Sequence, residues 1–400
     1  MDLKSTHPFW FIKNGLIRSY PPLERDVSCD VAIVGGGISG ALLAERLTRL
    51  GMKVVVLDRR EVGLGSTSAS TSLLQYEIDV SLVDLTELIG QEAAVQAYRL
   101  SYESIDRLAE LVDSLPTDCG FQRKLSLYVA SRPADVPLLK AEYAARQSIG
   151  FDVRYLEGEE LRETHGLSYP AALVSTQAAS VDAYRLAHAL LEATTRGGGA
   201  VYDRTTVQSY QPSAGGTLLL TDRGPTVQAR QVLIATGYEA QQMLREKIVD
   251  LKSTYAVVTQ PLDSLGSWNR DWIMWETKRP YLYLRTTSDN RMLAGGEDDN
   301  FRDPARRDRS LASKSQRLLT RLEELFPELD LEIEFRWAGT FGETKDGLAY
   351  IGASPEYPTC HFALGFGGNG ITFSSIAADL LSKVLTGQPA PELELFRFGR

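Results

Sequence analysis

The chain has 400 residues, of which 43% are hydrophobic and 24% charged, so its composition is that of a globular protein rather than a disordered or collagen-like one. The length predicts about two to three domains, and the formal net charge of -9 disfavours non-specific binding to nucleic acids. No apolar run reaches the roughly 18 residues that span a bilayer, and three scattered cysteines without metal or redox spacing favour a reducing cytoplasm.

The first predicted elements are a buried strand over 30–34, a helix over 41–50 and a second strand over 53–57. A strand–helix–strand unit of this kind predicts a parallel sheet with a right-handed crossover. The turn before the helix reads Gly35-Gly36-Gly37-Ile38-Ser39-Gly40, which matches the G-x-G-x-x-G pattern, and Asp58 closes the second strand. This context predicts a dinucleotide site at the end of the first two strands.

Each glycine of this pattern has its own expected role. Gly35 allows the tight turn, Gly37 lets the backbone approach a pyrophosphate, and Gly40 lets the helix pack on the strand. The helix N-terminus supplies unpaired N–H groups for the phosphates, and Asp58 is expected to accept hydrogen bonds from the adenosine ribose. The motif leaves two alternatives open: a purely structural glycine turn, and a site for NAD rather than FAD.

The middle of the chain changes character. Helices are predicted around 80–89 and 92–115. Strands are predicted at 124–130, 255–260, 281–285, 292–294 and 332–338. Turn residues at 288–290 and the spacing of these strands predict an antiparallel sheet. Segment 297–309 is dense in both signs of charge and is predicted to be a solvated loop.

A second glycine-rich turn occupies residues 365–370, after a predicted strand at 361–364 and before a predicted helix at 372–385. The sequence leaves no room for another strand with a ribose-binding acid, so a second complete dinucleotide site is not expected. The turn instead predicts a helix N-terminus directed at a flavin ring, where it would stabilise the anionic reduced form. A glycine turn that serves packing alone is the alternative.

Several motifs in a fixed order resemble those of the D-amino acid oxidase-like family of FAD-dependent oxidoreductases. Within that family, the chain is most similar to the γ-glutamylputrescine oxidase-like and glycine oxidase-like branch, and the resemblance covers nearly the whole chain. Besides the two glycine turns and Asp58, the landmarks lie at 20–23, 63–71, 181–186, 235–237, 337–341 and 344–347.

The resemblance implies an α/β fold in which a Rossmann-like FAD-binding domain is interleaved with an α+β substrate domain that contains an antiparallel sheet. Both domains are expected to be discontinuous in the sequence. The FAD-binding domain is assigned to 1–78, 171–252 and 346–400, and the substrate domain to 79–170 and 253–345.

The resemblance also implies which residues contact FAD. Carried over position by position, they are Gly35, Gly37, Ile38, Ser39, Gly40, Asp58, Arg59, Gly65, Ser66, Thr67, Val207, Thr236, Gly237, Gly367, Gly368, Asn369, Gly370, Ile371 and Thr372. No cysteine lies near 341–347 and no histidine near 63–72, where some relatives attach the cofactor. FAD is therefore expected to be bound non-covalently.

On the substrate side, Tyr281, Tyr283 and Arg285 alternate along a predicted strand and so share one face. The resemblance implies that this strand borders the substrate cavity, with the two rings as a wall and the guanidinium as a carboxylate ligand. Further candidates near the flavin or the substrate are Glu343, Lys345, Gln75 and Tyr76. For all of these, packing within the sheet or a solvated charge is the ordinary alternative.

The sequence departs from the family pattern at several positions, including Ala349 in place of a proline, and two of the departures bear on the substrate and the electron acceptor. Amino acid oxidases of this family commonly carry Arg-Pro after the Trp-x-Gly element, and that Arg binds the substrate carboxylate. Here the positions hold Phe341 and Gly342, so a substrate carboxylate lacks one expected anchor. The resemblance also implies a lysine that some relatives use for reaction with oxygen, and the strand at 291–296 lacks it. The sequence therefore leaves open whether oxygen or another molecule accepts the electrons.

The resemblance implies oxidation of the C–N bond of a small amine or amino acid by hydride transfer to flavin, giving an imine that hydrolyses. Three alternatives are an FAD-dependent 2-hydroxy acid oxidoreductase of the same fold, a non-catalytic flavin-binding protein and an NAD-dependent dehydrogenase. The four histidines and three cysteines form no ligand pattern, so no metal is expected. The identity of the substrate and the oligomeric state stay open.

Overall fold

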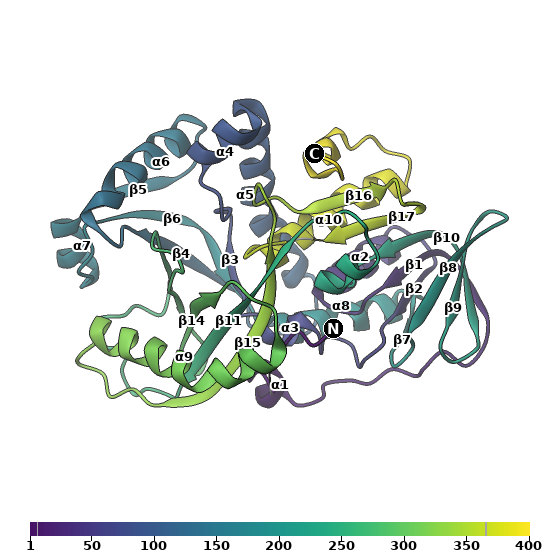
Figure 1. The fold of residues 1–400 in the computed structure, drawn as a ribbon, viewed down its shortest axis with the longest axis horizontal. Coiled ribbons are helices and arrows are strands. Elements are labelled where there is room, and N and C mark those ends of the chain that lie inside the picture. The colour runs from purple at the N-terminus through teal and green to yellow at the C-terminus, as the bar shows by residue number, and fades with distance from the viewer. Residues whose placement is uncertain (6, 365) are drawn as a thin grey trace.

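The computed structural model describes residues 1–5, 7–364 and 366–400, which form two lobes that are each built on one large sheet (Figure 1). Strands from 27–57, 200–234 and 350–364 make the first sheet, and strands from 73–180 and 250–343 make the second. The chain therefore passes repeatedly between the lobes. This confirms the predicted fold class, a mainly parallel α/β unit interleaved with an α+β unit.

The first sheet is mainly parallel. Its strands run in the order β16 (Tyr350–Ser354), β17 (Tyr357–Leu364), β10 (Thr226–Ile234), β1 (Val27–Val34), β2 (Val54–Leu57) and β7 (Ala200–Tyr202), and a hairpin of β8 (Val207–Ser213) and β9 (Gly216–Thr221) joins at β10. β1 is parallel to both β2 and β10, as the strand–helix–strand unit predicts. All four residues of β2 are buried, which is typical of a parallel strand covered on both faces.

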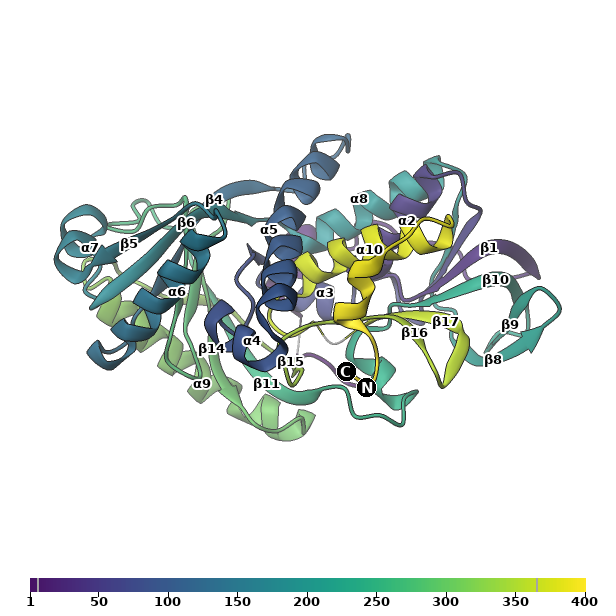
Figure 2. The ribbon, with the colours of Figure 1, turned by 90° about the horizontal axis from the view of Figure 1, so that it is seen from above.

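Helices α8 (Ala183–Arg196), α2 (Ile38–Arg49) and α10 (Gly370–Leu385) lie side by side over one face of this sheet, and α5 (Gln91–Asp113) packs beside α10 (Figure 2). Because side chains alternate along a strand, neighbouring residues of β1 enter different cores. Ile33 packs in the core beneath these helices, whereas Val34 packs in the core on the opposite face.

The second sheet is almost entirely antiparallel. Its strands run in the order β15 (Ile333–Glu343), β11 (Asp250–Thr259), β14 (Met292–Asp299), β13 (Tyr283–Thr286), β12 (Trp272–Glu276), β4 (Gln122–Val129), β6 (Ala171–Ser180) and β3 (Leu73–Gln75), and β5 (Val153–Glu157) pairs with β6. Only the pairing of β12 with β4 is parallel among the described strands of this sheet. Helix α9 (Pro304–Leu325) packs on one face through Leu311, Leu318 and Leu322, which recur at helical spacing.

The remaining helices are shorter and lie around the two sheets. They are α1 (Phe9–Asn14), α3 (Ser66–Ala69), α4 (Leu82–Ile89), α6 (Val136–Ser148), α7 (Gly158–His165) and the 3-10 helices Pro133–Asp135, Gly237–Gln242 and Pro391–Phe396. Within the described ranges, no helix combines the length and the apolar character that crossing a membrane requires.

The structure differs from the predicted elements in three places. β13 begins at Tyr283 rather than at Tyr281, since its partner β14 bulges beyond Gly295. The predicted solvated loop at 297–309 is largely the end of β14 and the start of α9, because its charged side chains pair with those of α9. β3 and β6, which the predicted boundaries assign to the FAD-binding domain, pair within the second sheet.

Candidate active site

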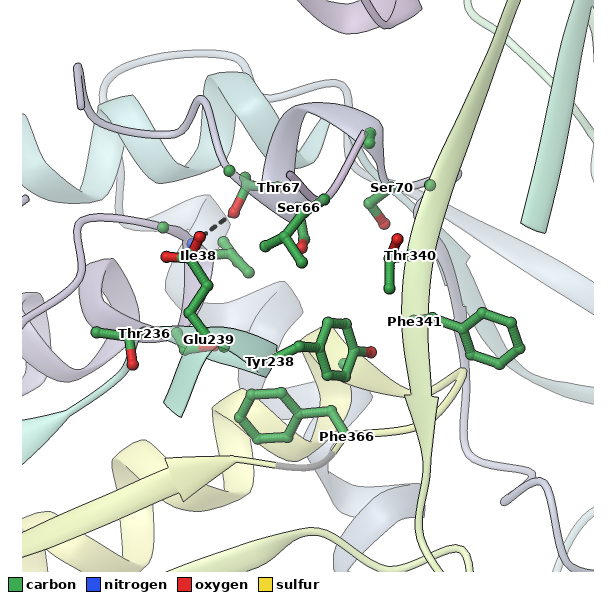
Figure 3. A pocket seen from close by; sticks show the side chains of 18 of the residues that line it. Ile38, Ser66, Thr67, Ser70, Thr236, Tyr238, Glu239, Thr340, Phe341 and Phe366 are labelled. Carbon is green, nitrogen blue, oxygen red and sulfur yellow. Dashed lines mark hydrogen bonds between the residues drawn. The ribbon is translucent and has the colours of Figure 1, made fainter. Parts of the chain in front are cut away.

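A cavity of about 460 Å³ lies between the two sheets and takes its lining from both. On the first sheet it lies beyond the carboxyl ends of β1, β2 and β10, at Val34, Leu57 and Ala235. Ligands of parallel α/β sheets bind at this edge. Figure 3 shows Ser66 and Thr67 on one side of the open space and Tyr238 and Phe366 on another.

The turn from β1 into α2 has no space for side chains at two of its glycines. Gly35 has a φ of +112°, and a Cβ there would lie 2.3 Å from the carbonyl oxygen of Ala235. A Cβ on Gly40 would lie 1.8 Å from the carbonyl oxygen of Gly35. The turn therefore depends on close backbone approach, and α2 begins directly against the cavity.

Polar groups surround the N-terminus of α2. The Ile38 N–H donates to the Thr67 hydroxyl at 2.9 Å, the bond drawn in Figure 3. The hydroxyl oxygens of Ser66 and Thr236 are buried and have no hydrogen-bond partner among the described residues. Because a buried polar group without a partner is costly, these hydroxyls and the helix N-terminus suit an anionic ligand such as a pyrophosphate.

Asp58 is fixed at the end of β2. Its carboxylate accepts from the N–H of Gly36 at 2.7 Å and from the N–H of Arg60 at 2.8 Å. Burial raises the pKa of Asp58, and the two backbone hydrogen bonds oppose that rise. Arg59 and Arg60 both pair with Glu239, which also lines the cavity. This end therefore holds a preoriented carboxylate beside two guanidiniums that share a single carboxylate partner.

Most predicted cofactor residues line this cavity. They are Gly35, Gly37, Ile38, Ser39, Asp58, Arg59, Gly65, Ser66, Thr67, Val207, Thr236, Gly237, Gly367, Gly368, Gly370 and Ile371. Gly40, Asn369 and Thr372 do not line it and lie behind the two turns. Gly365, the first glycine of the second turn, lies outside the described residues.

The second glycine turn is tied to the segment that follows β3. The Asn369 side-chain amide donates to the carbonyl oxygens of Gln75 at 3.2 Å and of Glu77 at 2.8 Å. The Gly368 N–H donates to the Asp79 carboxylate at 2.8 Å. Asn369 therefore supports the turn in this structure, and α10 begins at the cavity wall with Gly370.

Three of the predicted substrate-side residues line the far end of the cavity: Gln75, Tyr281 and Tyr283. The two tyrosine rings are 5.7 Å apart, and the Tyr281 hydroxyl donates to Asp79 at 3.3 Å. Burial raises the pKa of Tyr283 to about 12, so its hydroxyl stays protonated at neutral pH. Its ring lies over Gly295, where a Cβ would approach it to 2.3 Å.

The other four candidates do not line the cavity. Arg285 donates to the carbonyl oxygen of Val181 at 3.1 Å, and burial lowers its pKa to about 10. Tyr76 points away because it follows Gln75 in an extended segment, and it is fully buried. Lys345 donates to a backbone carbonyl near the C-terminus, and Glu343 pairs with a lysine of β11. The shared face predicted for the two tyrosines and Arg285 thus reaches beyond the cavity.

Several lining residues were not predicted from the sequence. Among them are Thr254, Tyr238, Thr340, Phe366 and Asp298. Tyr238 directly follows the 235–237 landmark of the family resemblance, so its position near the cofactor could have been predicted. For Asp298 the available signal was the Gly295-Gly296 pair, because glycine inside a strand often marks a bulge. Among the described residues, no group of His, Cys, Asp and Glu side chains could hold a metal ion.

The cavity fits an extended dinucleotide. It runs from the Asp58 carboxylate past the α2 N-terminus to the tyrosines of the second sheet, and its glycine turns leave room for close backbone approach. The buried, unpartnered hydroxyls of Ser66 and Thr236 belong to residues of its lining. These features suit the FAD that the resemblance implies.

Comparisons with known proteins agree with this geometry. The model of the family DAO, described as FAD dependent oxidoreductase, matches residues 30–384. The chain is 24% identical to Gamma-glutamylputrescine oxidoreductase of Escherichia coli over 92% of this chain and 86% of that protein. It is 27% identical to Glycine oxidase of Geobacillus kaustophilus over 89% of this chain and 92% of that protein.

Solved structures show the same fold. Glycine oxidase from Geobacillus kaustophilus superposes with a TM-score of 0.79 at 24% identity, covering 93% of this chain and 99% of that one. L-proline dehydrogenase from P. horikoshii also gives a TM-score of 0.79, at 19% identity, covering 94% of this chain and 97% of that one.

Proposed function

The chain belongs to the DAO family of FAD-dependent oxidoreductases, and on that basis we propose that it oxidises the C–N bond of a small amine or amino acid. The observation that carries the proposal is the cavity itself, which joins a dinucleotide-type glycine turn to an aromatic pocket of the second sheet. Relatives named for oxidation of γ-glutamylputrescine and of glycine, each matched over most of its length, support this reaction class.

FAD is the cofactor of this family, and we propose its placement along the cavity. The α2 N-terminus would bind the pyrophosphate with Ser66 and Thr67, and Asp58 would accept hydrogen bonds from the adenosine ribose. The second glycine turn and α10 would lie at the flavin. No cysteine or histidine lines the cavity in the described part of the chain, so we propose that FAD is held without a covalent bond.

Bound FAD supplies the acceptor for the two electrons and the proton that leave the substrate as hydride, and the resulting imine then reacts with water. The protein would orient the substrate toward the flavin. Tyr281 and Tyr283 would form one wall of the substrate pocket, and Gln75 would contribute an amide beside them. An amine that binds as an ammonium ion must lose one N–H proton before its carbon gives up hydride, but it has no hydroxyl proton for a base to remove. The lack of a histidine in the described lining fits such a substrate better than an alcohol.

The remaining partners and the location are also proposals. Oxygen or another acceptor would reoxidise the flavin. Cys29, Cys119 and Cys360 are buried and free, which suits the reducing cytoplasm that we propose as the place of action. We further propose the predicted domain division, with β3 and β6 moved to the substrate domain.

The test is an anaerobic titration of purified holoenzyme, followed by flavin absorbance, with amines, amino acids and 2-hydroxy acids. Bleaching by an amine or amino acid, with formation of the matching carbonyl product, would support the proposal. Bleaching by hydroxy acids alone would replace it with the 2-hydroxy acid activity. A flavin that no compound reduces would contradict an enzymatic role on these substrate classes.

A further inference from the structure

Asp298 lies at the far end of the cavity on an irregular part of β14. Glu297 and Asp298 stand opposite the single residue Thr254 of β11, which is the arrangement of a β-bulge. Glu297 has a φ of 59°, in the left-handed region that non-glycine residues rarely adopt. Strained backbone of this kind persists where the surrounding structure maintains it, often beside functional sites.

The bulge changes which side chains face the cavity. The Glu297 carboxylate lies 2.8 Å from Arg317, and the Asp299 carboxylate lies 2.8 Å from Lys314, so both point to α9 on the opposite face of the sheet. Asp298, between them, lines the cavity. A regular strand that continued from Gly295, which lies under the Tyr283 ring, would have pointed Asp298 away from the cavity. The bulge therefore directs this carboxylate into the pocket.

The Asp298 carboxylate is incompletely paired. Its Oδ1 atom is buried without a hydrogen-bond partner among the described residues. Burial raises the pKa of Asp298 to about 6, the nearby carboxylates of Glu343 and Asp79 raise it as well, and Thr254 and Lys252 oppose the rise. Lys252 itself pairs with Glu343. A bound cation would compensate this carboxylate, because an opposite charge favours the ionised form.

Among the described residues, the cavity lining at this end carries no cationic side chain. Within the described residues, the arginines of the lining are Arg59 and Arg60, which pair with Glu239 at the Asp58 end. Phe341, which also lines the cavity, is uncharged. A substrate carboxylate beside the reacting carbon would therefore meet the Asp298 carboxylate without a lining guanidinium to offset it.

We propose that Asp298 binds the ammonium group of the substrate and that the substrate is an amine without a carboxylate next to the oxidised carbon. This inference rests on the proposed oxidation of amines and narrows it to one substrate class. Asp298 would determine specificity by charge, since a buried carboxylate attracts an ammonium ion and repels a second carboxylate. The aromatic walls at Tyr281 and Tyr283 would hold the apolar part of the same substrate.

The experiment measures calorimetric binding of three compounds to the holoenzyme at pH 7.5. The compounds are tert-butylammonium, 2-aminoisobutyrate and pivalate, which share a branched carbon skeleton and differ in charge. None has a hydrogen on a carbon that bears nitrogen, so none can be oxidised at a C–N bond and binding is separated from turnover. We expect tert-butylammonium to bind about tenfold or more tightly than 2-aminoisobutyrate, and pivalate to bind most weakly.

Three variants connect this preference to one side chain. Asp298→Asn should weaken binding of tert-butylammonium by about tenfold or more, and Asp298→Glu, which keeps the charge, should restore part of it. Asp263→Asn changes an exposed aspartate outside the cavity and should bind like the unchanged protein. Flavin content and melting temperature show whether each variant is folded.

The comparison of compounds on the unchanged holoenzyme needs no variant. Tighter binding of 2-aminoisobutyrate, or binding of none of the three compounds, would overturn the inference. So would a folded Asp298→Asn protein that binds tert-butylammonium normally. If 2-aminoisobutyrate bound more tightly than tert-butylammonium and amino acids still reduced the flavin, the proposed oxidation would stand and only the assignment of Asp298 would fail. Arg279, which lies against the Tyr281 ring outside the cavity lining, would then be the guanidinium to replace.

Discussion

At the first-sheet end of the cavity, the residues proposed to bind FAD come from short, continuous segments and act largely through their backbone. At the second-sheet end, the proposed substrate pocket takes side chains from four separate segments of the chain, at Gln75, Thr254, Tyr281 with Tyr283, and Asp298. The first end depends on local turn geometry, and the second depends on strand register and one bulge. Changes at the first end should therefore affect FAD binding, whereas changes at the second should affect substrate selection.

The largest expected effect comes from the glycine turn. Gly40→Ala places a Cβ 1.8 Å from the carbonyl oxygen of Gly35, so the turn and α2 must shift. We expect loss of FAD and a decrease of about 3 kcal/mol in the free energy of unfolding. Urea unfolding and flavin content measure both. Gly150→Ala, at a glycine with φ +85° and open space around it, should cost about 1 kcal/mol and retain FAD.

A smaller and more selective effect, a loss of FAD affinity alone, is expected from Asp58→Asn. The variant keeps an oxygen that can accept from Gly36 or Arg60 but removes the charge that would bind the ribose hydroxyls. The dissociation constant for FAD should rise about tenfold to a hundredfold, as measured by fluorescence titration of the apoprotein. The rate of flavin reduction by substrate, at saturating FAD, should stay unchanged. A large change in that rate would contradict the division of the cavity into an FAD-binding end and a substrate-binding end.

A pH dependence of amine binding is expected at the substrate end. Asp298 has a pKa of about 6, raised by burial above the ordinary value of 3.8, so its charge is present above pH 6 and lost below it. Simple alkylammonium ions stay protonated through this range. The dissociation constant of tert-butylammonium should therefore rise about tenfold from pH 7 to pH 5, because roughly a tenth of Asp298 remains ionised. Asp298→Asn should show a flat profile, and an inflection that survives in that variant would assign the titration to another group.

The same ionisation has an effect on stability with a defined sign. Because the folded-state pKa of Asp298 exceeds that of the unfolded chain, this residue favours the folded state most below about pH 4 and loses that contribution as pH rises through 6. At high pH, a bound ammonium ion offsets the loss of stability that the ionised Asp298 carboxylate causes. Tert-butylammonium should accordingly raise the melting temperature more at pH 7 than at pH 5, which a thermal scan at the two pH values checks.

The contrast between the two ends also explains what the sequence could predict. The glycine turn and Asp58 were recognisable because strand, turn and helix follow each other directly and each glycine has a steric reason. Arg285 was expected in the substrate pocket because it alternates with two tyrosines on a strand that the resemblance put at the cavity, yet the face that it shares extends past the cavity to Val181. Asp298 was not predicted to line the cavity, because it lies in a charged segment that was predicted to be a solvated loop. Its orientation depends on a bulge opposite Thr254, and such a shift in register arises from pairing between distant strands.

The smallest expected effect concerns a single hydroxyl. Tyr283→Phe keeps the ring over Gly295 but removes the hydroxyl that interacts with Thr254 and Thr71. We expect kcat/KM for the amine to fall about fivefold or less, since one neutral hydrogen bond is worth about 1 kcal/mol, with FAD affinity unchanged. Tyr155→Phe, which alters a hydroxyl on β5 outside the cavity, is the matched control. A loss of FAD on removing the Tyr283 hydroxyl would mean that the second sheet also determines cofactor affinity, because the side chain would then act across both ends of the cavity.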